Sequence, residues 1–185
     1  MKKRKAVFLD RDGTIIVHKS YLNSPDQLLL LPNAAQGIRL FNEEGYLVIV
    51  ITNQSGIARG FFDEKCLDLI HKKMADMLRN EGATIDDIYY CPHYKEGMIE
   101  QYTKDCDCRK PKIGMFLKAA RQYHIDFSQS LMIGDSEVDI RAGKNAGCKC
   151  VLIKDSKESQ NTTIAVADTD YVVKDLLEAA RLFTE

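Results

Sequence analysis

The sequence predicts an α/β fold with a doubly wound, Rossmann-like parallel sheet, because short apolar runs alternate with amphipathic segments along the chain. Residues 46–51 form an unbroken apolar run rich in β-branched side chains, which is typical of a strand buried on both faces. Polar residues of several chemical kinds stand just after these runs. They are expected to meet at the carboxyl edge of the sheet, where folds of this class bind ligands.

The individual elements follow from apolar periodicity and from their end signals. Strands are expected at residues 5–9, 46–51, 87–91, 130–134, 149–153 and 171–173. Helices are expected at residues 34–44, 115–124, 137–145 and 175–183, and between Asp63 and Gly82. Asn33 and Asp63 are the predicted N-caps of the first two helices. The polar stretch 154–169 is predicted to be a surface connection.

Length and charge limit what the protein can be. The 185 residues, 45% hydrophobic and 29% charged, fit one globular domain covering 1–185. The formal net charge of −1 gives no basic field to hold nucleic acid or an anionic membrane. The sequence shows no export signal and no apolar stretch near the roughly 18 residues of a spanning helix. We therefore expect a cytoplasmic protein, and a monomer because no large apolar stripe is evident.

Carboxylates, a hydroxyl and an ammonium group follow the expected strands: Asp10 with Asp12, Thr52, Lys110, and Asp135 with Asp139. Neighbouring carboxylates repel by roughly 4 kcal/mol per close pair at an effective dielectric constant of 20, so the cluster needs a divalent cation. Oxygen ligands favour Mg²⁺, with Asp135 completing its site. The set suits phosphoryl transfer, with Asp10 as nucleophile and Asp12 as general acid and base. Thr52 and Lys110 would stabilise the phosphoryl oxygens.

A second group of candidate metal ligands lies between residues 91 and 108, at the start of and within the aperiodic segment 92–112. Cys91, His93, Cys106 and Cys108 form a C-x-H-x12-C-x-C pattern, which suits tetrahedral Zn²⁺. Four protein ligands leave no open position, so this zinc would be structural and would hold the loop that carries Arg109 and Lys110. Buried or redox-active cysteines without metal are the alternative.

Four segments carry a resemblance to a known family: residues 8–15 (Phe-Leu-Asp-Arg-Asp-Gly-Thr-Ile), 51–60, 108–112 and 132–139. They resemble, in order, the four motifs of the haloacid dehalogenase (HAD) superfamily of phosphatases, over nearly the whole chain. The resemblance implies an aspartyl-phosphate mechanism on Asp10, with Mg²⁺ held by Asp10, Asp135 and the backbone carbonyl of Asp12. It also implies substrate recognition by Arg109 and zinc in the cysteine loop.

The segment between Asp12 and Thr52 is filled by a turn, a polar flap and one helix, so no cap domain fits. Short loops should then recognise the substrate. Their residues are His18, Lys19, Ser20, Tyr21, Asn53, Gln54, Ser55 and Arg109. Within the superfamily the motifs are most similar to the heptose bisphosphate phosphatases. The resemblance implies a small phosphorylated sugar as substrate, and hydrolysis of the 7-phosphate of D-glycero-D-manno-heptose 1,7-bisphosphate in nucleotide-activated heptose synthesis.

Other interpretations remain open from the sequence. The histidinol-phosphate phosphatases are the next most similar subfamily, and another small sugar phosphate could be the substrate. A receiver-like signalling domain and a non-catalytic zinc module are the alternatives of a different class. Ser136 and residues 18–20 depart from the pattern of the enterobacterial heptose enzymes. Two other histidines, His71 and His124, are expected to be solvated helix residues.

Overall fold

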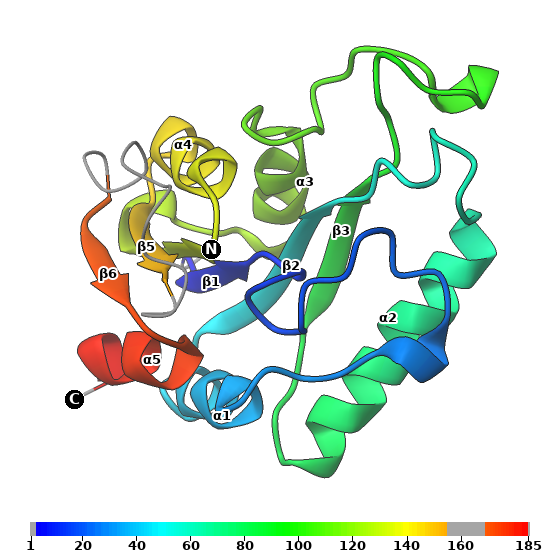
Figure 1. Ribbon diagram of the computed structural model, residues 1–185. Coiled ribbons are helices and arrows are strands. Elements are labelled where there is room, and N and C mark those ends of the chain that lie inside the picture. Colours follow the sequence, from blue (N-terminus) through cyan, green and yellow to red (C-terminus); the bar gives the residue numbers. More distant parts are fainter. Residues whose placement is uncertain (1–2, 155–168, 185) are drawn as a thin grey trace.

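A computed structural model of the chain describes residues 3–154 and 169–184, and shows a parallel sheet of six strands (Figure 1). The strands are β1 (Ala6–Leu9), β2 (Leu47–Asn53), β3 (Asp87–Cys91), β4 (Leu131–Gly134), β5 (Lys149–Ile153) and β6 (Tyr171–Val173). Their spatial order is β3-β2-β1-β4-β5-β6. The order reverses between β1 and β4, and such switch points carry the binding crevice in doubly wound sheets.

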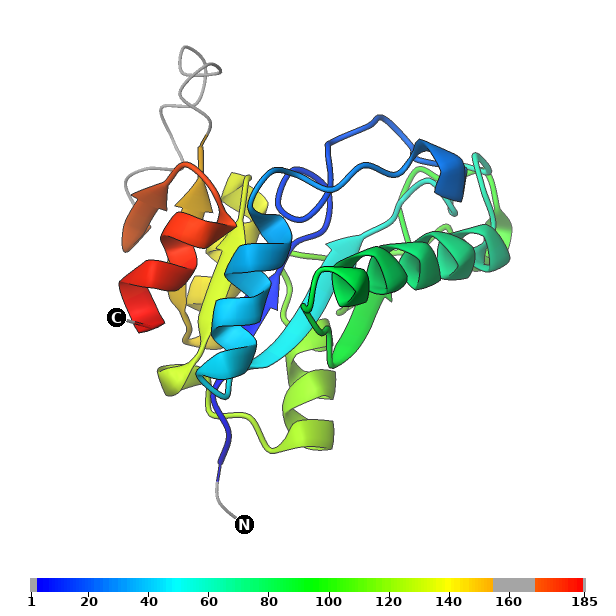
Figure 2. The ribbon, with the colours of Figure 1, turned by 90° about the horizontal axis from the view of Figure 1, so that it is seen from below.

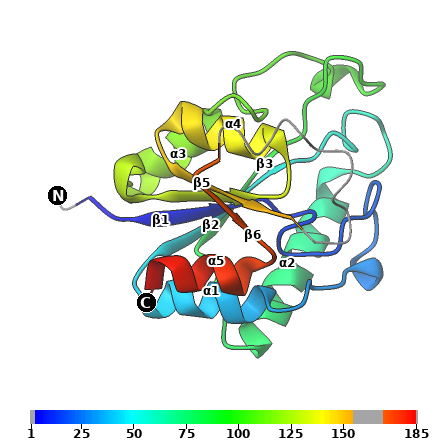
Figure 3. The ribbon, with the colours of Figure 1, turned by 60° about the vertical axis from the view of Figure 1, so that its left-hand side comes forward.

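Helices cover both faces of the sheet, as the predicted fold class requires (Figures 2 and 3). They are α1 (Ala34–Glu43), α2 (Glu64–Asn80), α3 (Gly114–Tyr123), α4 (Glu137–Ala146) and α5 (Leu176–Thr184). Helices α1, α2 and α5 share one core with the sheet, and α3 and α4 share the other. Three short 3-10 helices, Pro25–Gln27, Glu100–Tyr102 and Phe127–Gln129, lie in connections. The predicted bounds of β3, β5 and β6 are confirmed, and those of the other strands and helices differ by only a few residues.

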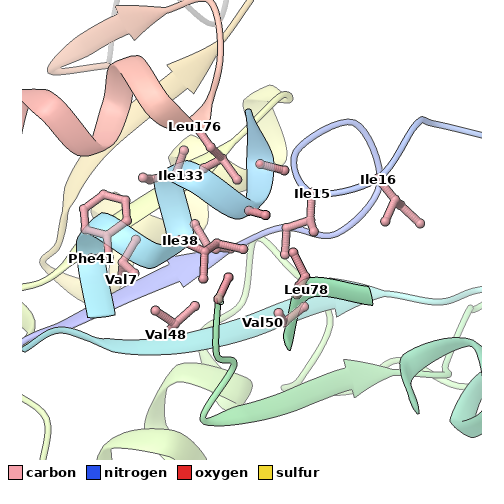
Figure 4. Close-up of a cluster of buried hydrophobic side chains, with 14 of the residues drawn as sticks. Val7, Ile15, Ile16, Ile38, Phe41, Val48, Val50, Leu78, Ile133 and Leu176 are labelled. Atoms are coloured by element: carbon pink, nitrogen blue, oxygen red, sulfur yellow. The ribbon is translucent and has the colours of Figure 1, made fainter. Parts of the chain in front are cut away.

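Alternation along the strands divides the apolar side chains between the two cores. Val7 and Leu9 of β1 belong to the core under α1, whereas Ala6 and Phe8 belong to the core under α3. Figure 4 shows the first core, where Val7 of β1 lies with Ile38 of α1. All of these side chains are fully buried, which explains why the strands read as continuous apolar runs.

The predicted N-caps have different outcomes. Asp63 caps α2 as expected, because its side chain accepts a hydrogen bond from the backbone N–H of Cys66 at 2.8 Å. Asn33 stands at the N-cap position of α1 as expected, but its backbone is left-handed (φ 65°) and its side chain makes no cap hydrogen bond to the helix. Its amide donates to Asp175, just before α5, at 2.8 Å. A tertiary contact between α1 and α5 has replaced the local one.

The loops after β1, β2 and β3 gather at the carboxyl end of the sheet (Figure 3). In the part of the chain that the structure describes, no cap domain interrupts these connections. No described helix combines the length and the apolar character needed to cross a membrane. Most of the predicted surface connection at 154–169 lies outside the described residues.

We expect Phe116→Ala to lower the free energy of unfolding by about 3–5 kcal/mol, because a fully buried aromatic ring would leave a cavity. Phe116 packs on Phe8 with ring centroids 4.7 Å apart. Leu117→Ala, at the half-exposed next position of α3, is the matched control and should cost at most about 1 kcal/mol. Denaturant titration measures both, and equal losses would contradict the assignment of Phe116 to the core.

Candidate active site

The turn after β1 places two carboxylates at the switch point. The backbone N–H of Asp10 donates to the carbonyl of Ile133 in β4 at 3.0 Å, which ties the turn to the neighbouring strand. Gly13 has a φ of +81°, and a Cβ there would overlap the carboxylate of Asp135. Glycine is thus required both for the backbone conformation and for the close approach of Asp135. The ends of β1 and β4 are held against each other.

Lys110 is the buried cation at the centre of the site, only 4% exposed. Its Nζ donates to Oδ1 of Asp10 and to Oδ1 of Asp139, both at 2.6 Å. It also donates to the backbone carbonyl of Ile51 in β2 at 2.8 Å. One ammonium group therefore connects the end of β1, strand β2 and helix α4.

Asp139 joins the site together with Asp135, as expected from its place after β4, although it was assigned no chemical role. It lies in the first turn of α4, where its Oδ2 accepts hydrogen bonds from the Ser136 hydroxyl at 2.5 Å and the Ser136 N–H at 3.2 Å. Its other oxygen meets Lys110. The signal for its position was the capping-box pattern at the start of α4, where a carboxylate stands three residues after Ser136.

The electrostatics of the site favour a bound cation. Burial raises the pKa of Asp10 to about 7, and Asp139 and Asp12 add to the rise, although Lys110 opposes it. Partial burial and Asp139 raise the pKa of Asp135 to about 6. Burial also disfavours the charge of Lys110, yet Asp10 and Asp139 raise its pKa above the ordinary value. Carboxylates outnumber the ammonium group here, so the cluster is short of positive charge.

Oxygen atoms of Asp10, Asp135 and Asp139 lie within 4.8 Å of one another. Hard carboxylate oxygens at such separations fit Mg²⁺. Asp139 already holds Lys110 and Ser136 with its two oxygens, so Asp10 and Asp135 are the members freer to bind an ion.

Asp12 and Thr52 are joined by Gln54. The side-chain amide of Gln54 donates to Oδ2 of Asp12 at 2.9 Å and to Oγ1 of Thr52 at 2.8 Å. Asp12 also forms a salt bridge with Arg11, whose Nη2 lies 2.9 Å from Oδ2. Two separate donors therefore fix the orientation of the Asp12 carboxylate.

The prediction that His71 is solvated is wrong. His71 lies on the buried face of α2, 7% exposed, and its Nε2 is 3.2 Å from Nη1 of Arg11. Burial and the Arg11 charge lower its pKa to about 3. Its spacing from Leu67 and Met74 follows the apolar face of the helix, which is the signal that could have revealed it. His124, at the end of α3, is exposed as expected.

Two adjoining cavities, each about 270 Å³, share Asp12, His18 and Asn53 in their walls. One contains the remaining catalytic candidates together with Ser136. The other is lined by the predicted substrate loops, namely Lys19, Ser20, Tyr21, Gln54 and Ser55. The structure thus brings these loops to a hollow beside the carboxylates, which a substrate could fill while its phosphate lies at Asp10.

Asn53 and Arg109 were predicted to contact the substrate. In the structure, both side chains form hydrogen bonds with backbone atoms of the loop. The amide of Asn53 donates to the carbonyl of Lys110 at 3.1 Å and accepts from its N–H at 3.0 Å. Arg109 donates to the carbonyl of His93 at 3.3 Å, and its guanidinium lies 5.3 Å from the centre of the Tyr94 ring. Both residues therefore help to hold the segment that delivers Lys110.

The predicted zinc ligands meet in one cluster. The Sγ atom of Cys108 lies 3.2 Å from those of Cys91 and Cys106, and 3.3 Å from Nδ1 of His93. Zn–S bonds of about 2.3 Å give tetrahedral edges of about 3.8 Å, so the ligand atoms would have to move apart by only a few tenths of an ångström to hold the ion. Contact with Cys91 lowers the pKa of Cys108 to about 5, which supplies a thiolate. Three sulfurs and one imidazole fit Zn²⁺.

Comparison with known proteins agrees with this architecture. A HAD-hydrolase-like family model matches residues 107–179. The D-glycero-beta-D-manno-heptose-1,7-bisphosphate 7-phosphatase of Pasteurella multocida is 41% identical over 182 residues, covering 94% of this chain and 98% of the relative. The D-glycero-alpha-D-manno-heptose-1,7-bisphosphate 7-phosphatase of Photorhabdus laumondii is 39% identical, covering 87% of this chain and 88% of that relative.

A crystal structure of the D,D-heptose 1,7-bisphosphate phosphatase from B. bronchiseptica, complexed with magnesium and phosphate, superposes with a TM-score of 0.84. It is 34% identical, and the match covers 96% of this chain and 97% of that one. With its strand order and the carboxylates at the switch point, this chain is a HAD-like hydrolase, and residues 3–154 and 169–184 include no cap domain. Within that class it belongs to the D-glycero-D-manno-heptose 1,7-bisphosphate 7-phosphatase family of phosphoric monoester hydrolases.

We expect the affinity for Mg²⁺ to fall as the pH drops below about 7, because raised pKa values mean that protons occupy Asp10 and Asp135 there. The rise in Tm on adding Mg²⁺ should be largest near pH 8 and small near pH 5. Asp135→Asn is the control, and should show little rise at either pH. A rise in the unchanged protein that does not depend on pH would contradict the assignment.

Proposed function

We propose that this protein hydrolyses the 7-phosphate of D-glycero-D-manno-heptose 1,7-bisphosphate, releasing inorganic phosphate. The observation that carries the proposal is the buried contact of Asp10 with Lys110 at 2.6 Å, beside Asp12 and Asp135, in a member of this phosphatase family. Family membership favours the heptose over histidinol phosphate. A signalling receiver or a non-catalytic zinc module would not explain membership of a hydrolase family.

Asp10 would act as the nucleophile. Its Oδ1 holds Lys110, so the other carboxylate oxygen is free to attack phosphorus in line with the departing sugar oxygen. Asp12 would give a proton to that oxygen as the P–O bond breaks. Water would then attack the aspartyl-phosphate, with Asp12 taking its proton, so that phosphate leaves and Asp10 is restored. The hydroxyl of Thr52 and the ammonium of Lys110 would stabilise the phosphoryl oxygens.

Asp10, Asp135 and the backbone carbonyl of Asp12 would hold the Mg²⁺. The ion would supply positive charge against the oxygens of the transferring phosphoryl group. Asp139 would act on Lys110, because one of its oxygens already accepts from that ammonium. Lys110 would then keep Asp139 as a carboxylate partner whether or not the ion is bound.

The loops around the second cavity would recognise the sugar. His18, Lys19, Ser20, Tyr21, Gln54 and Ser55 all line it. We propose that Asn53 and Arg109 act chiefly by holding the backbone of Lys110 and of His93, respectively. Relatives named for the beta and for the alpha anomer are of similar identity, so both anomers belong in a substrate test.

We further propose that the cysteine cluster binds a structural Zn²⁺. All six cysteines are unpaired in the structure, which suits a reducing cytoplasm. We also propose a monomer with one domain spanning 1–185.

For the activity, we expect kcat/KM to rank one anomer of heptose 1,7-bisphosphate above fructose 1,6-bisphosphate and histidinol phosphate. Asp10→Asn should lower the rate by about 10³-fold or more, because an amide cannot act as the nucleophile, and the Tm should stay near that of the unchanged protein, because the amide oxygen can still accept from Lys110. Release of inorganic phosphate in the presence of Mg²⁺ measures the ranking of substrates and the loss of rate in Asp10→Asn. A preference for histidinol phosphate would overturn the substrate and leave the chemistry intact.

For the zinc, we expect about one Zn²⁺ per purified chain, retained when Mg²⁺ is stripped. Cys106→Ser should lose the zinc and lower kcat by roughly tenfold or more, because the segment that carries Lys110 would lose its anchor. Cys66→Ser, outside the cluster, is the matched control and should keep both. Active protein without zinc would refute the structural role.

A further inference from the structure

Arg11 occupies an unusual place between the two catalytic aspartates. Its side chain is 1% exposed and carries a buried positive charge in addition to that of Lys110. Nε and Nη2 form one edge of the guanidinium, and this edge grips the Asp12 carboxylate at 3.2, 3.0 and 2.9 Å. The remaining nitrogen, Nη1, points the other way and meets His71. The guanidinium is thus clamped between a carboxylate and an imidazole.

The chemistry of this contact fixes the state of the histidine. A guanidinium can only donate hydrogen bonds, so Nε2 of His71 must accept, and the ring must be neutral with its proton on Nδ1. The low pKa of His71, about 3, agrees with a ring that stays neutral across the working range of pH. His71 therefore offers Arg11 a permanent acceptor in a place that water does not reach.

The imidazole is itself held in place. His71 sits on the face of α2 that also buries Ile70 and Met74. Its ring lies 5.9 Å from that of Tyr90, whose hydroxyl donates to Glu64 of the same helix at 2.9 Å. The acceptor is consequently part of the rigid core and does not lie on a loop.

We propose that His71 is a positioning residue for the general acid: it fixes Arg11, which in turn fixes the carboxyl group of Asp12, and this group in its protonated form gives its proton to the leaving group. The inference rests on the proposed function, because it assumes that Asp12 protonates that group. Losing the imidazole acceptor would free Nη1 and let the guanidinium turn away from Asp12.

Leaving groups of different basicity test this role. The value of kcat/KM reports the steps up to cleavage of the P–O bond, so it excludes the later attack of water on the aspartyl-phosphate. A nitrophenolate departs without a proton, whereas a phenolate or a sugar alkoxide needs one. The substrates are therefore p-nitrophenyl phosphate, phenyl phosphate and heptose 1,7-bisphosphate, and the first two have similar shapes and no sugar to recognise.

We expect His71→Leu to lower kcat/KM for phenyl phosphate and for the heptose by roughly tenfold or more, and for p-nitrophenyl phosphate by less than about twofold. His71→Gln, which can return an acceptor near Nε2, should recover most of the loss. Ile70→Val is the matched control for packing in α2, and should leave the ratio between substrates unchanged. If His71→Leu does not fold, Arg11→Lys breaks the same clamp and should show the same selective loss.

Equal losses on the two aryl phosphates, or no loss on either, would overturn the role of His71 while the proposed function stands. Failure of the unchanged protein to release phosphate from any of the three substrates would instead overturn the proposed function, and this inference with it.

Discussion

The buried ammonium of Lys110 is the charge around which the carboxyl edge of the sheet is organised. It reaches Asp10 after β1, the backbone of β2 and Asp139 in α4 through three short hydrogen bonds. Without it, two carboxylates would face each other in a poorly solvated space, where an unpaired charge is strongly destabilising. The lysine belongs to a long loop, so the architecture of the site depends on how that loop is fixed.

Several contacts fix the loop from different sides. Its base is tied to β2 by the two hydrogen bonds between Asn53 and the backbone of Lys110. Its outer part is tied to α2, because Glu64 accepts from the hydroxyls of both Tyr90 and Tyr102. The carbonyl of Ala58 accepts from two successive N–H groups, those of Met98 and Ile99. The cysteine cluster lies between these points, where a metal would draw the two halves of the loop together.

The fold could be predicted because its strands are apolar on both faces and so leave an unambiguous pattern. The site could be predicted in outline, since parallel strands bring Asp10, Thr52 and Asp135 to one edge. What escaped prediction depended on partners distant in the chain. Asn33 stands at the expected N-cap position, but its side chain bonds to Asp175 and makes no cap hydrogen bond to α1. His71 has the polarity of a surface residue, but Arg11, from a loop 60 positions earlier, gives it a buried partner.

The described residues include no cap domain over the site, and this affects how products can leave. Enzymes that enclose their substrates must reopen before products diffuse away, and that movement often limits their rate. Here short loops line the cavity beside Asp12, and within the described residues no large element has to move aside. An open site does not exclude water from the substrate, and discrimination between sugars has to come from a few side chains on the rim of the cavity. Changes confined to that rim could retune its choice of substrate while the chemistry beneath is left alone.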